Sequence, residues 1–260
     1  MPRGRASNYD EQREMILAKA AHLFAHGGYP GTSMNQVAVA TGLSKATLYH
    51  YFRDKYSLLL DITEGHVSRL EALVIDVNAQ QLSPERRMRG LIARIMAEYS
   101  GAQDAHRVLT SDVRFLETED RKRVLDKERR VVVGFADAIA AWRPEQREAA
   151  LTKPLTMLLF GMINWMFTWM RSEGALSHEA MAPIVADLFF GGVPAVRGSS
   201  VRAPAKGKAV VSAKAGTQLV HVVPAKAGTQ RRSIGKPTTR GPSVRGGDGV
   251  LAARINRCKT

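Results

Sequence analysis

Residues 42–52 read GLSKATLYHYF, and they place apolar and polar side chains on opposite sides of one short helix. Leu43, Leu48 and Phe52 share a side that suits packing against neighbouring helices. The other side presents groups that donate hydrogen bonds or carry charge: Ser44, Lys45, Thr47, Tyr49 and His50. Polar groups gathered in this way are typical of a helix that lies against phosphates and base edges.

The flanking sequence predicts further short helices around this one. A helix over 10–27 buries Ile16 and Phe24 and stops at Gly27-Gly28. Thr32 or Ser33 is predicted to cap a second helix that breaks at Gly42, Ser44 caps the third, and Asp54 caps the fourth. Short helices with a glycine in the middle turn indicate a helix-turn-helix unit, with its motif at about 33–52.

Two more residues of this segment lie at predicted helix starts. Ser33 begins the second helix and Lys55 begins the fourth. Because a helix N-terminus attracts phosphate, we expect both residues to contact a nucleic-acid backbone from either side of the third helix. Lys45, Tyr49 and Lys55 have no evident structural role in the sequence, which favours contact with DNA.

The rest of the chain predicts an all-α fold. Helices are expected from Ser83 onward and over 104–116, 119–141, 145–172 and 178–190, and no stretch alternates like a strand. Pro154 and Pro183 should end or kink their helices. The apolar run at 155–170 is shorter than a membrane span and indicates a buried helix.

Charge is distributed unevenly along the 260 residues. Residues 195–260 hold 14 Lys and Arg against the single acid Asp248, whereas residues 1–194 are nearly neutral. The last 70 residues also lack Phe, Trp and Tyr, so they cannot bury enough apolar surface to fold. We therefore predict a DNA-binding domain at 1–56, a larger helical ligand-binding and dimerisation domain at 57–194, and a basic, disordered tail at 195–260.

Several protein classes are disfavoured. Cys258 is the only cysteine, and the N-terminus has no apolar leader segment, so we expect a cytoplasmic protein without disulfides. No phosphate loop, nucleophile elbow or paired-histidine zinc motif occurs in the body, so we expect neither an enzyme nor a cofactor. His22 and His26 share a helix face, but without a third ligand they predict a solvated surface and no metal site.

Residues 28–60, GYPGTSMNQVAVATGLSKATLYHYFRDKYSLLL, closely resemble the DNA-binding signature of the TetR family of bacterial regulators. The resemblance implies an N-terminal helix-turn-helix domain, a ligand-binding and dimerising body, and a homodimer on a palindromic, double-stranded operator. It assigns DNA contacts to the residues that match the signature: Ser33, Ser44, Lys45, Thr47, Tyr49, His50 and Lys55. The signature usually places two aromatic residues before its histidine, whereas this chain has Tyr49-His50-Tyr51.

Residues 158–193 are similar to the last two helices of the family branch that senses acyl-CoA thioesters. The 155–170 helix carries methionines and tryptophans that suit an apolar ligand, with a charged residue beyond them for a head group. The predicted ligand-binding residues are Met162, Trp165, Met166, Trp169 and Arg171. Packing in the core or at a dimer interface is the alternative for the tryptophans, since the helices at 145–172 and 178–190, including Leu159 and Phe189, are also the predicted dimer interface.

The leading hypothesis is a repressor that an apolar small molecule such as an acyl-CoA releases from its operator. The alternatives are a multidrug-sensing repressor of efflux genes and a protein that coats the chromosome without regard to sequence. Survival of the operator complex in excess random DNA separates a repressor from a coating protein.

Overall fold

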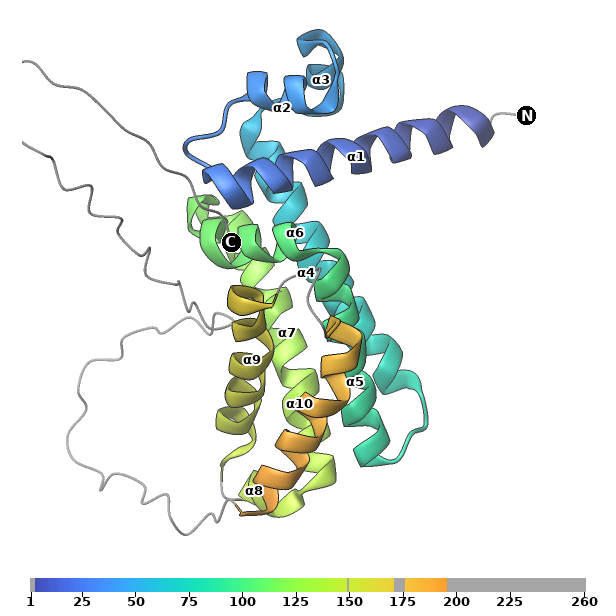
Figure 1. Ribbon diagram of the computed structural model, residues 1–260, viewed down its shortest axis with the longest axis vertical. Helices are drawn as coiled ribbons and strands as arrows, with labels where there is room; N and C mark the ends of the chain where they lie inside the picture. Colours follow the sequence, from blue (N-terminus) through green and yellow to red (C-terminus); the bar gives the residue numbers. More distant parts are fainter. Residues whose placement is uncertain (1–2, 149, 171–175, 196–260) are drawn as a thin grey trace, which may run out of the picture. The chain divides into compact units, whose positions relative to one another are not determined.

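A computed structural model describes residues 3–148, 150–170 and 176–195, all within one compact unit, and these residues contain helices and no strand (Figure 1). Most of the predicted tail lies outside them. The helices are α1 (Arg3–Gly27), α2 (Met34–Thr41), α3 (Lys45–Tyr51), α4 (Lys55–Ala79), α5 (Pro84–Gly101), α6 (Gln103–Asp112), α7 (Thr118–Trp142), α8 (Pro144–Glu148), α9 (Thr152–Trp169) and α10 (His178–Gly192), with the 3-10 turns η1 (Val113–Phe115) and η2 (Val193–Ala195). None of these helices is both long and apolar enough to cross a membrane.

One apolar core joins the N-terminal helices to part of the body. Ile16 and Phe24 of α1 are buried with Leu48 of α3 and the first turns of α4. Val108 of α6 and Val124 of α7 belong to the same buried cluster. The core of the helix-turn-helix unit is therefore completed by helices that come later in the chain, so a shift of α6 or α7 changes the support of α3.

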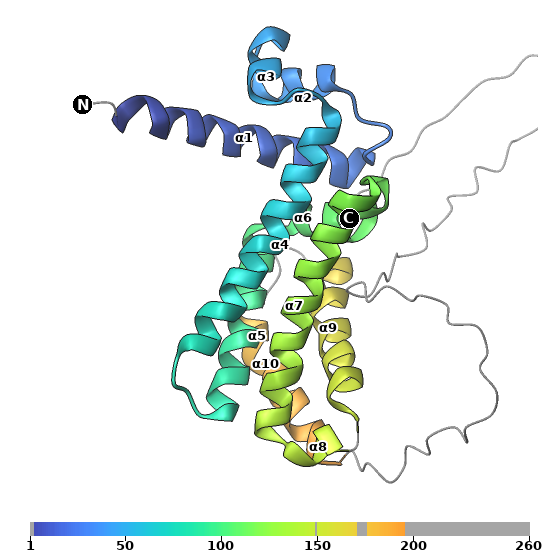
Figure 2. The ribbon, with the colours of Figure 1, turned by 180° about the vertical axis from the view of Figure 1, so that it is seen from behind.

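A second core fills the body between α4, α5, α7, α9 and α10. The ring centroids of Phe135 on α7 and Phe160 on α9 lie 4.9 Å apart, and Trp142 packs edge-on against Phe190 of α10 at 4.4 Å. Figure 2 shows α7 running between α4 and α9. Because α4 contributes residues to both cores, it connects the helix-turn-helix unit with the body.

The structure corrects two predicted helices. The single helix expected at 145–172 is divided: α8 ends at Glu148 and α9 begins at Thr152. Ala150 lies between them with a φ of 57°, a left-handed conformation that interrupts a helix. Pro154 falls in the first turn of α9, where its missing N–H leaves no hydrogen bond unmade. Pro183, by contrast, does not end its helix, and α10 continues through it to Gly192.

Candidate nucleic-acid interface

Helix α3 is short, capped at its start and exposed along its polar side. Ser44 is its N-cap, and the hydroxyl accepts a hydrogen bond from the backbone N–H of Thr47 at 3.1 Å. Leu48 is fully buried and Phe52 is nearly so. The predicted contact residues of this helix are all exposed: Ser44, Lys45, Thr47, Tyr49 and His50. The apolar side of α3 therefore packs as the sequence predicts. Its polar side is exposed, and contact of that side with DNA stays a prediction.

The turn between α2 and α3 is fixed by local hydrogen bonds. Ser33 caps α2, and the side chain of Gln36 accepts from the Ser33 backbone N–H at 2.7 Å, which completes a capping box. Gly42 ends α2 with a φ of 69°, a conformation that favours glycine. Thr32, the alternative cap, is buried, and its hydroxyl donates to the carbonyl oxygens of Leu23 in α1 and Gly28 just after it. The Ser-x-x-Gln spacing was a readable signal for the box.

The start of α4 is equally well defined. Asp54 accepts the backbone N–H of Ser57 at 2.7 Å, and this hydrogen bond lowers the pKa of the Asp54 carboxyl. Lys55 follows, but its ammonium donates to the Tyr29 carbonyl oxygen at 2.9 Å and lies 4.4 Å from the centroid of the Tyr29 ring. The expectation that Lys55 has no structural role was wrong. Lys55 stabilises the turn after α1 through its contacts with Tyr29, and its contact with DNA stays a prediction.

Two residues of α1 that the sequence did not single out support α3. Tyr9 stacks on Tyr51 with centroids 4.7 Å apart, which gives Tyr51 a packing role and leaves His50 on the exposed side. Arg13 donates to Asp61 of α4 at 2.5 Å and lies over the Phe52 ring. These contacts join residues far apart in the chain, so the periodicity of α1 alone does not reveal them.

A short polar helix held on an apolar base, preceded by a capped helix and a left-handed glycine, is the geometry of a helix-turn-helix reader. Residues 16–62 match the family described as bacterial regulatory proteins, tetR family. Residues 81–193 match the tetracyclin repressor-like C-terminal domain. This chain belongs to the TetR family. Its members are transcriptional regulators in which the helix-turn-helix unit binds DNA.

Relatives extend the likeness over most of the described residues. A TetR-family regulator from Bordetella parapertussis is 32% identical, with a TM-score of 0.66 over 71% of this chain and 97% of that one. The transcriptional repressor KstR2 of Mycobacterium tuberculosis is 24% identical over 72% of this chain and 96% of its own length. AibR, solved with isovaleryl coenzyme A and operator DNA, is 23% identical, with a TM-score of 0.58 over 68% of this chain and 97% of AibR.

The predicted ligand-binding residues that the structure describes lie in different surroundings. Met166 is buried in the body core and Met162 packs against that core. Trp165 and Trp169 are 49% and 53% exposed, so they point outward. Arg171 lies outside the described residues. The α9 tryptophans therefore fit the packing alternative at an interface better than the wall of an interior pocket.

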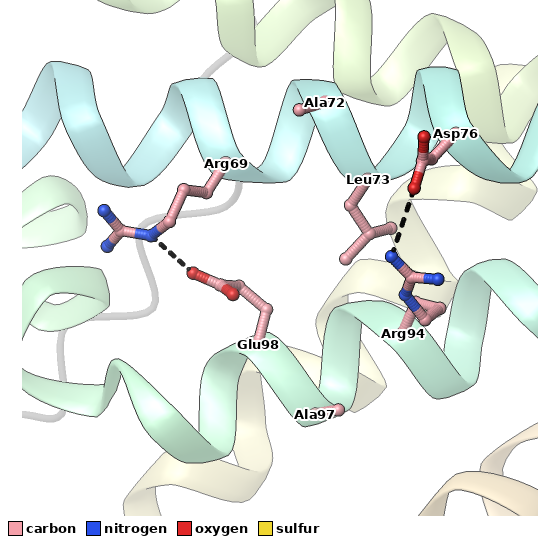
Figure 3. Close-up of a pocket in the computed structure, with 7 residues that line it drawn as sticks. All are labelled: Arg69, Ala72, Leu73, Asp76, Arg94, Ala97 and Glu98. Carbon is pink, nitrogen blue, oxygen red and sulfur yellow. Dashed lines mark hydrogen bonds and ion pairs between the residues drawn. The ribbon is translucent and has the colours of Figure 1, made fainter.

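Two hollows lie elsewhere, along α4. A groove of about 1010 Å³ runs between α1, α4 and the α5–α6 junction, and its walls include Arg13, Glu64 and Lys127. A smaller hollow of about 520 Å³ lies between α4 and α5, where ion pairs from Arg69 to Glu98 and from Arg94 to Asp76 flank Leu73 (Figure 3). Arg69 borders both hollows. No local sequence pattern predicts these hollows, since their walls come from separate helices.

Proposed function

We propose that this TetR-family regulator is a ligand-responsive repressor, released from a palindromic operator by an apolar small molecule such as an acyl-CoA thioester. The observation that carries the proposal is the core shared by α3, α4, α6 and α7. It links the exposed polar side of the reading helix to helices of the body by direct packing.

The DNA side of the proposal rests on α3. Lys45 and Thr47 in its first turn are exposed, while Leu48 is buried and anchors the opposite side of the helix. In a homodimer, two such helices would enter successive major grooves about 34–36 Å apart. Phosphate contacts from Ser33, Tyr49, His50 and Lys55 would set the register of each helix on its half-site.

Release requires a ligand that binds one arrangement of the helices more tightly than another. The groove between α1, α4 and the α5–α6 junction adjoins the shared core, since Leu17, Ala21 and Ile62 belong to both. A ligand that widened this groove would move α1 relative to α4. The spacing of the two reading helices in the dimer would then change.

The ligand class is proposed from two lines of support. AibR was solved with isovaleryl coenzyme A, and KstR2 is a ketosteroid transcriptional regulator. In this chain, Arg13, Arg69 and Lys127 line the large groove as cations for the phosphates of a coenzyme A thioester, which would replace their present partners Asp61, Glu98 and Glu64. Leu17, Ala21 and Ile62 line the same groove and offer apolar contacts for an acyl chain.

The experiment begins by selecting genomic fragments that the purified protein retains in excess random DNA. Fluorescence anisotropy on a recovered fragment then measures operator affinity with short, long and aromatic acyl-CoAs and with cationic drugs. Release by an acyl-CoA, which is recovered unchanged, supports the proposal. Release by the drugs alone indicates a multidrug sensor, and a complex lost to random DNA indicates a coating protein.

A further inference from the structure

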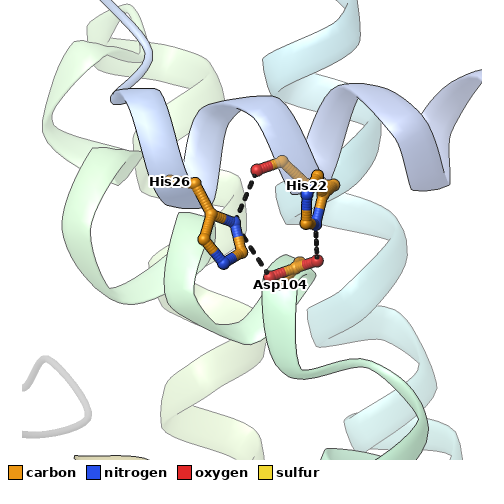
Figure 4. A group of neighbouring side chains, drawn as sticks. All are labelled: His22, His26 and Asp104. Carbon is orange, nitrogen blue, oxygen red and sulfur yellow. Dashed lines mark hydrogen bonds and ion pairs between the residues drawn. The ribbon is translucent and has the colours of Figure 1, made fainter. Parts of the chain in front are cut away.

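Three metal-binding side chains meet where α1 contacts α6 (Figure 4). His22 Nδ1 lies 2.9 Å from Asp104 Oδ2, and His26 Nδ1 lies 3.6 Å from Asp104 Oδ1. One ligand atom from each residue lies within 4.8 Å of the other two. We propose that His22, His26 and Asp104 form a binding site for a divalent transition-metal ion such as Zn²⁺, which joins α1 to α6.

The ligand set suits such an ion. Two imidazole nitrogens and one carboxylate oxygen are ligands that Zn²⁺ takes in proteins, and water supplies the fourth position of an open tetrahedral site. The spacing of four residues places both rings on one face of α1, with centroids 4.3 Å apart. Asp104 is the third ligand that the sequence alone does not reveal, since 82 residues separate it from His22.

A backbone hydrogen bond also orients the His26 ring. His26 Nδ1 lies 2.9 Å from the carbonyl oxygen of His22, and a carbonyl only accepts, so this nitrogen carries the proton. A neutral ring then keeps its lone pair on Nε2, the nitrogen available to a metal ion. A hydrogen bond from one ring nitrogen to a carbonyl is the usual way in which proteins orient a ligating histidine.

The site is open to ions from solution. The side chains of His22 and His26 are 60% and 53% exposed, and Asp104 lies in the wall of the large groove. A plain ion pair is the competing explanation, because a histidine near the end of α1 and an aspartate in the first turn of α6 both complement their helix dipoles. One histidine suffices for an ion pair, whereas both rings face the same carboxylate here.

A bound ion would link the helix-turn-helix unit to the body of the protein. α1 carries the residues that support α3, and α6 belongs to the shared core. Resting on the proposed function, we expect Zn²⁺ to hold α1 against α6 and so to reduce the loss of operator affinity that the ligand causes. Metal binding itself is independent of that function and is measured without DNA.

The test uses the full chain without a histidine tag. Co²⁺ is titrated while the visible absorption is recorded, because a four-coordinate Co²⁺ site absorbs more strongly than the hydrated ion, and Zn²⁺ is then added to displace it. We expect one ion per chain. His22→Ala, His26→Ala and Asp104→Asn should each weaken binding by at least about tenfold. His221→Ala, which removes a histidine far along the chain from these ligands, is the matched control.

A second readout is the unfolding temperature with and without Zn²⁺, since an ion that binds only the folded chain raises it. The rise should occur in the wild type and the His221→Ala control and be absent from the His22→Ala/His26→Ala double variant. Unchanged Zn²⁺ affinity in that double variant, or no Co²⁺ spectrum in the wild type, overturns the site. Circular dichroism without metal establishes that each variant is folded.

Discussion

Lys45 and Lys55 are two lysines of the same motif with different surroundings. Lys45 is exposed in the first turn of α3. Lys55 is partly buried, and its ammonium is held by the carbonyl oxygens of Tyr29 and Pro30. From the sequence motif alone, both lysines are predicted to contact phosphate. The structure shows that Lys45 is exposed, while Lys55 stabilises the turn between α1 and α2.

Replacing each lysine separates the two roles. Lys45→Ala should lower operator affinity and reduce the salt dependence of binding by about one phosphate contact, a slope change of roughly 0.9, with no change in unfolding. Lys55→Ala should also lower the free energy of unfolding by about 1 kcal/mol, because it removes hydrogen bonds and a ring contact. Anisotropy over a salt series and thermal unfolding measure both. An unchanged slope for Lys45→Ala would contradict the assigned docking.

A buried histidine makes stability depend on pH. His66 of α4 is fully buried with Nε2 3.2 Å from His106 Nδ1, and Tyr99, Glu98 and Arg69 also face it. Burial is the main cause that lowers its pKa well below 6.5, and unfavourable charge interactions with His106 and then Arg69 add to it. As the pH falls, His66 is protonated in the unfolded chain before it is protonated in the folded chain. Stability from this group is therefore present above about pH 6.5 and is lost as the pH falls below it.

His66→Gln should weaken that dependence. Below about pH 6.5 the wild type is expected to lose up to about 1.4 kcal/mol of unfolding free energy per pH unit through this group, and the variant should lose less. Denaturant unfolding between pH 7.5 and 5.5, with a chelator present to exclude metal effects, measures the two slopes. Equal slopes would show that His66 takes up its proton without unfolding.

At the scale of helices, Gly134 sets the approach of α7 to α4. A Cβ atom at this position would lie 2.3 Å from Val74 Cγ1, and valine has little freedom at χ1. Helix propensity alone favours alanine by about 1 kcal/mol. The steric cost of the added Cβ is larger than this gain in helix propensity, because relieving the clash requires α4 and α7 to separate along their packed length.

Gly134→Ala should therefore destabilise the protein by about 1–3 kcal/mol, as overpacking of a core does. Gly65→Ala, inside α4 with its nearest neighbour 3.7 Å from the added Cβ, is the control and should be neutral or stabilising by up to about 1 kcal/mol. Denaturant unfolding of both variants gives the comparison. A stabilised Gly134→Ala protein would mean that the two helices shift apart without loss.

Helix starts were predictable from sequence because their causes are local. Ser33, Ser44 and Asp54 each cap the helix that follows through a hydrogen bond three residues ahead. The break between α8 and α9 was not predictable, since the left-handed residue there is Ala150 and not glycine or asparagine. Nor was the meeting of α1 with Asp104, because it depends on how α6 packs and not on any neighbour in sequence.

At the scale of the whole molecule, α9 and α10 lie toward the viewer in Figure 1, and both helices carry large apolar side chains that are exposed. The exposed members are Leu158, Trp165 and Trp169 on α9, and Ile184 and Leu188 on α10. Exposed apolar surface of this extent on neighbouring helices marks an interaction site. Members of the TetR family dimerise, and we take this surface as the homodimer interface. Leu159 and Phe189, expected there from sequence, are instead buried in the body core.

A charge on this surface should separate the protomers. Leu158→Glu and Leu188→Glu alter side chains that are 65% exposed, so each variant should fold while losing roughly 2 kcal/mol or more of dimer stability. Ile75→Glu, at a residue 62% exposed on α4, adds the same charge away from the interface and should remain dimeric. Light scattering should give half the wild-type molar mass for the first two variants only.

Because a palindrome is read by two α3 helices at a fixed spacing, the monomeric variants should also bind the operator far more weakly than Ile75→Glu does. A wild type that is monomeric at micromolar concentration, or variants that stay dimeric, would place the interface elsewhere.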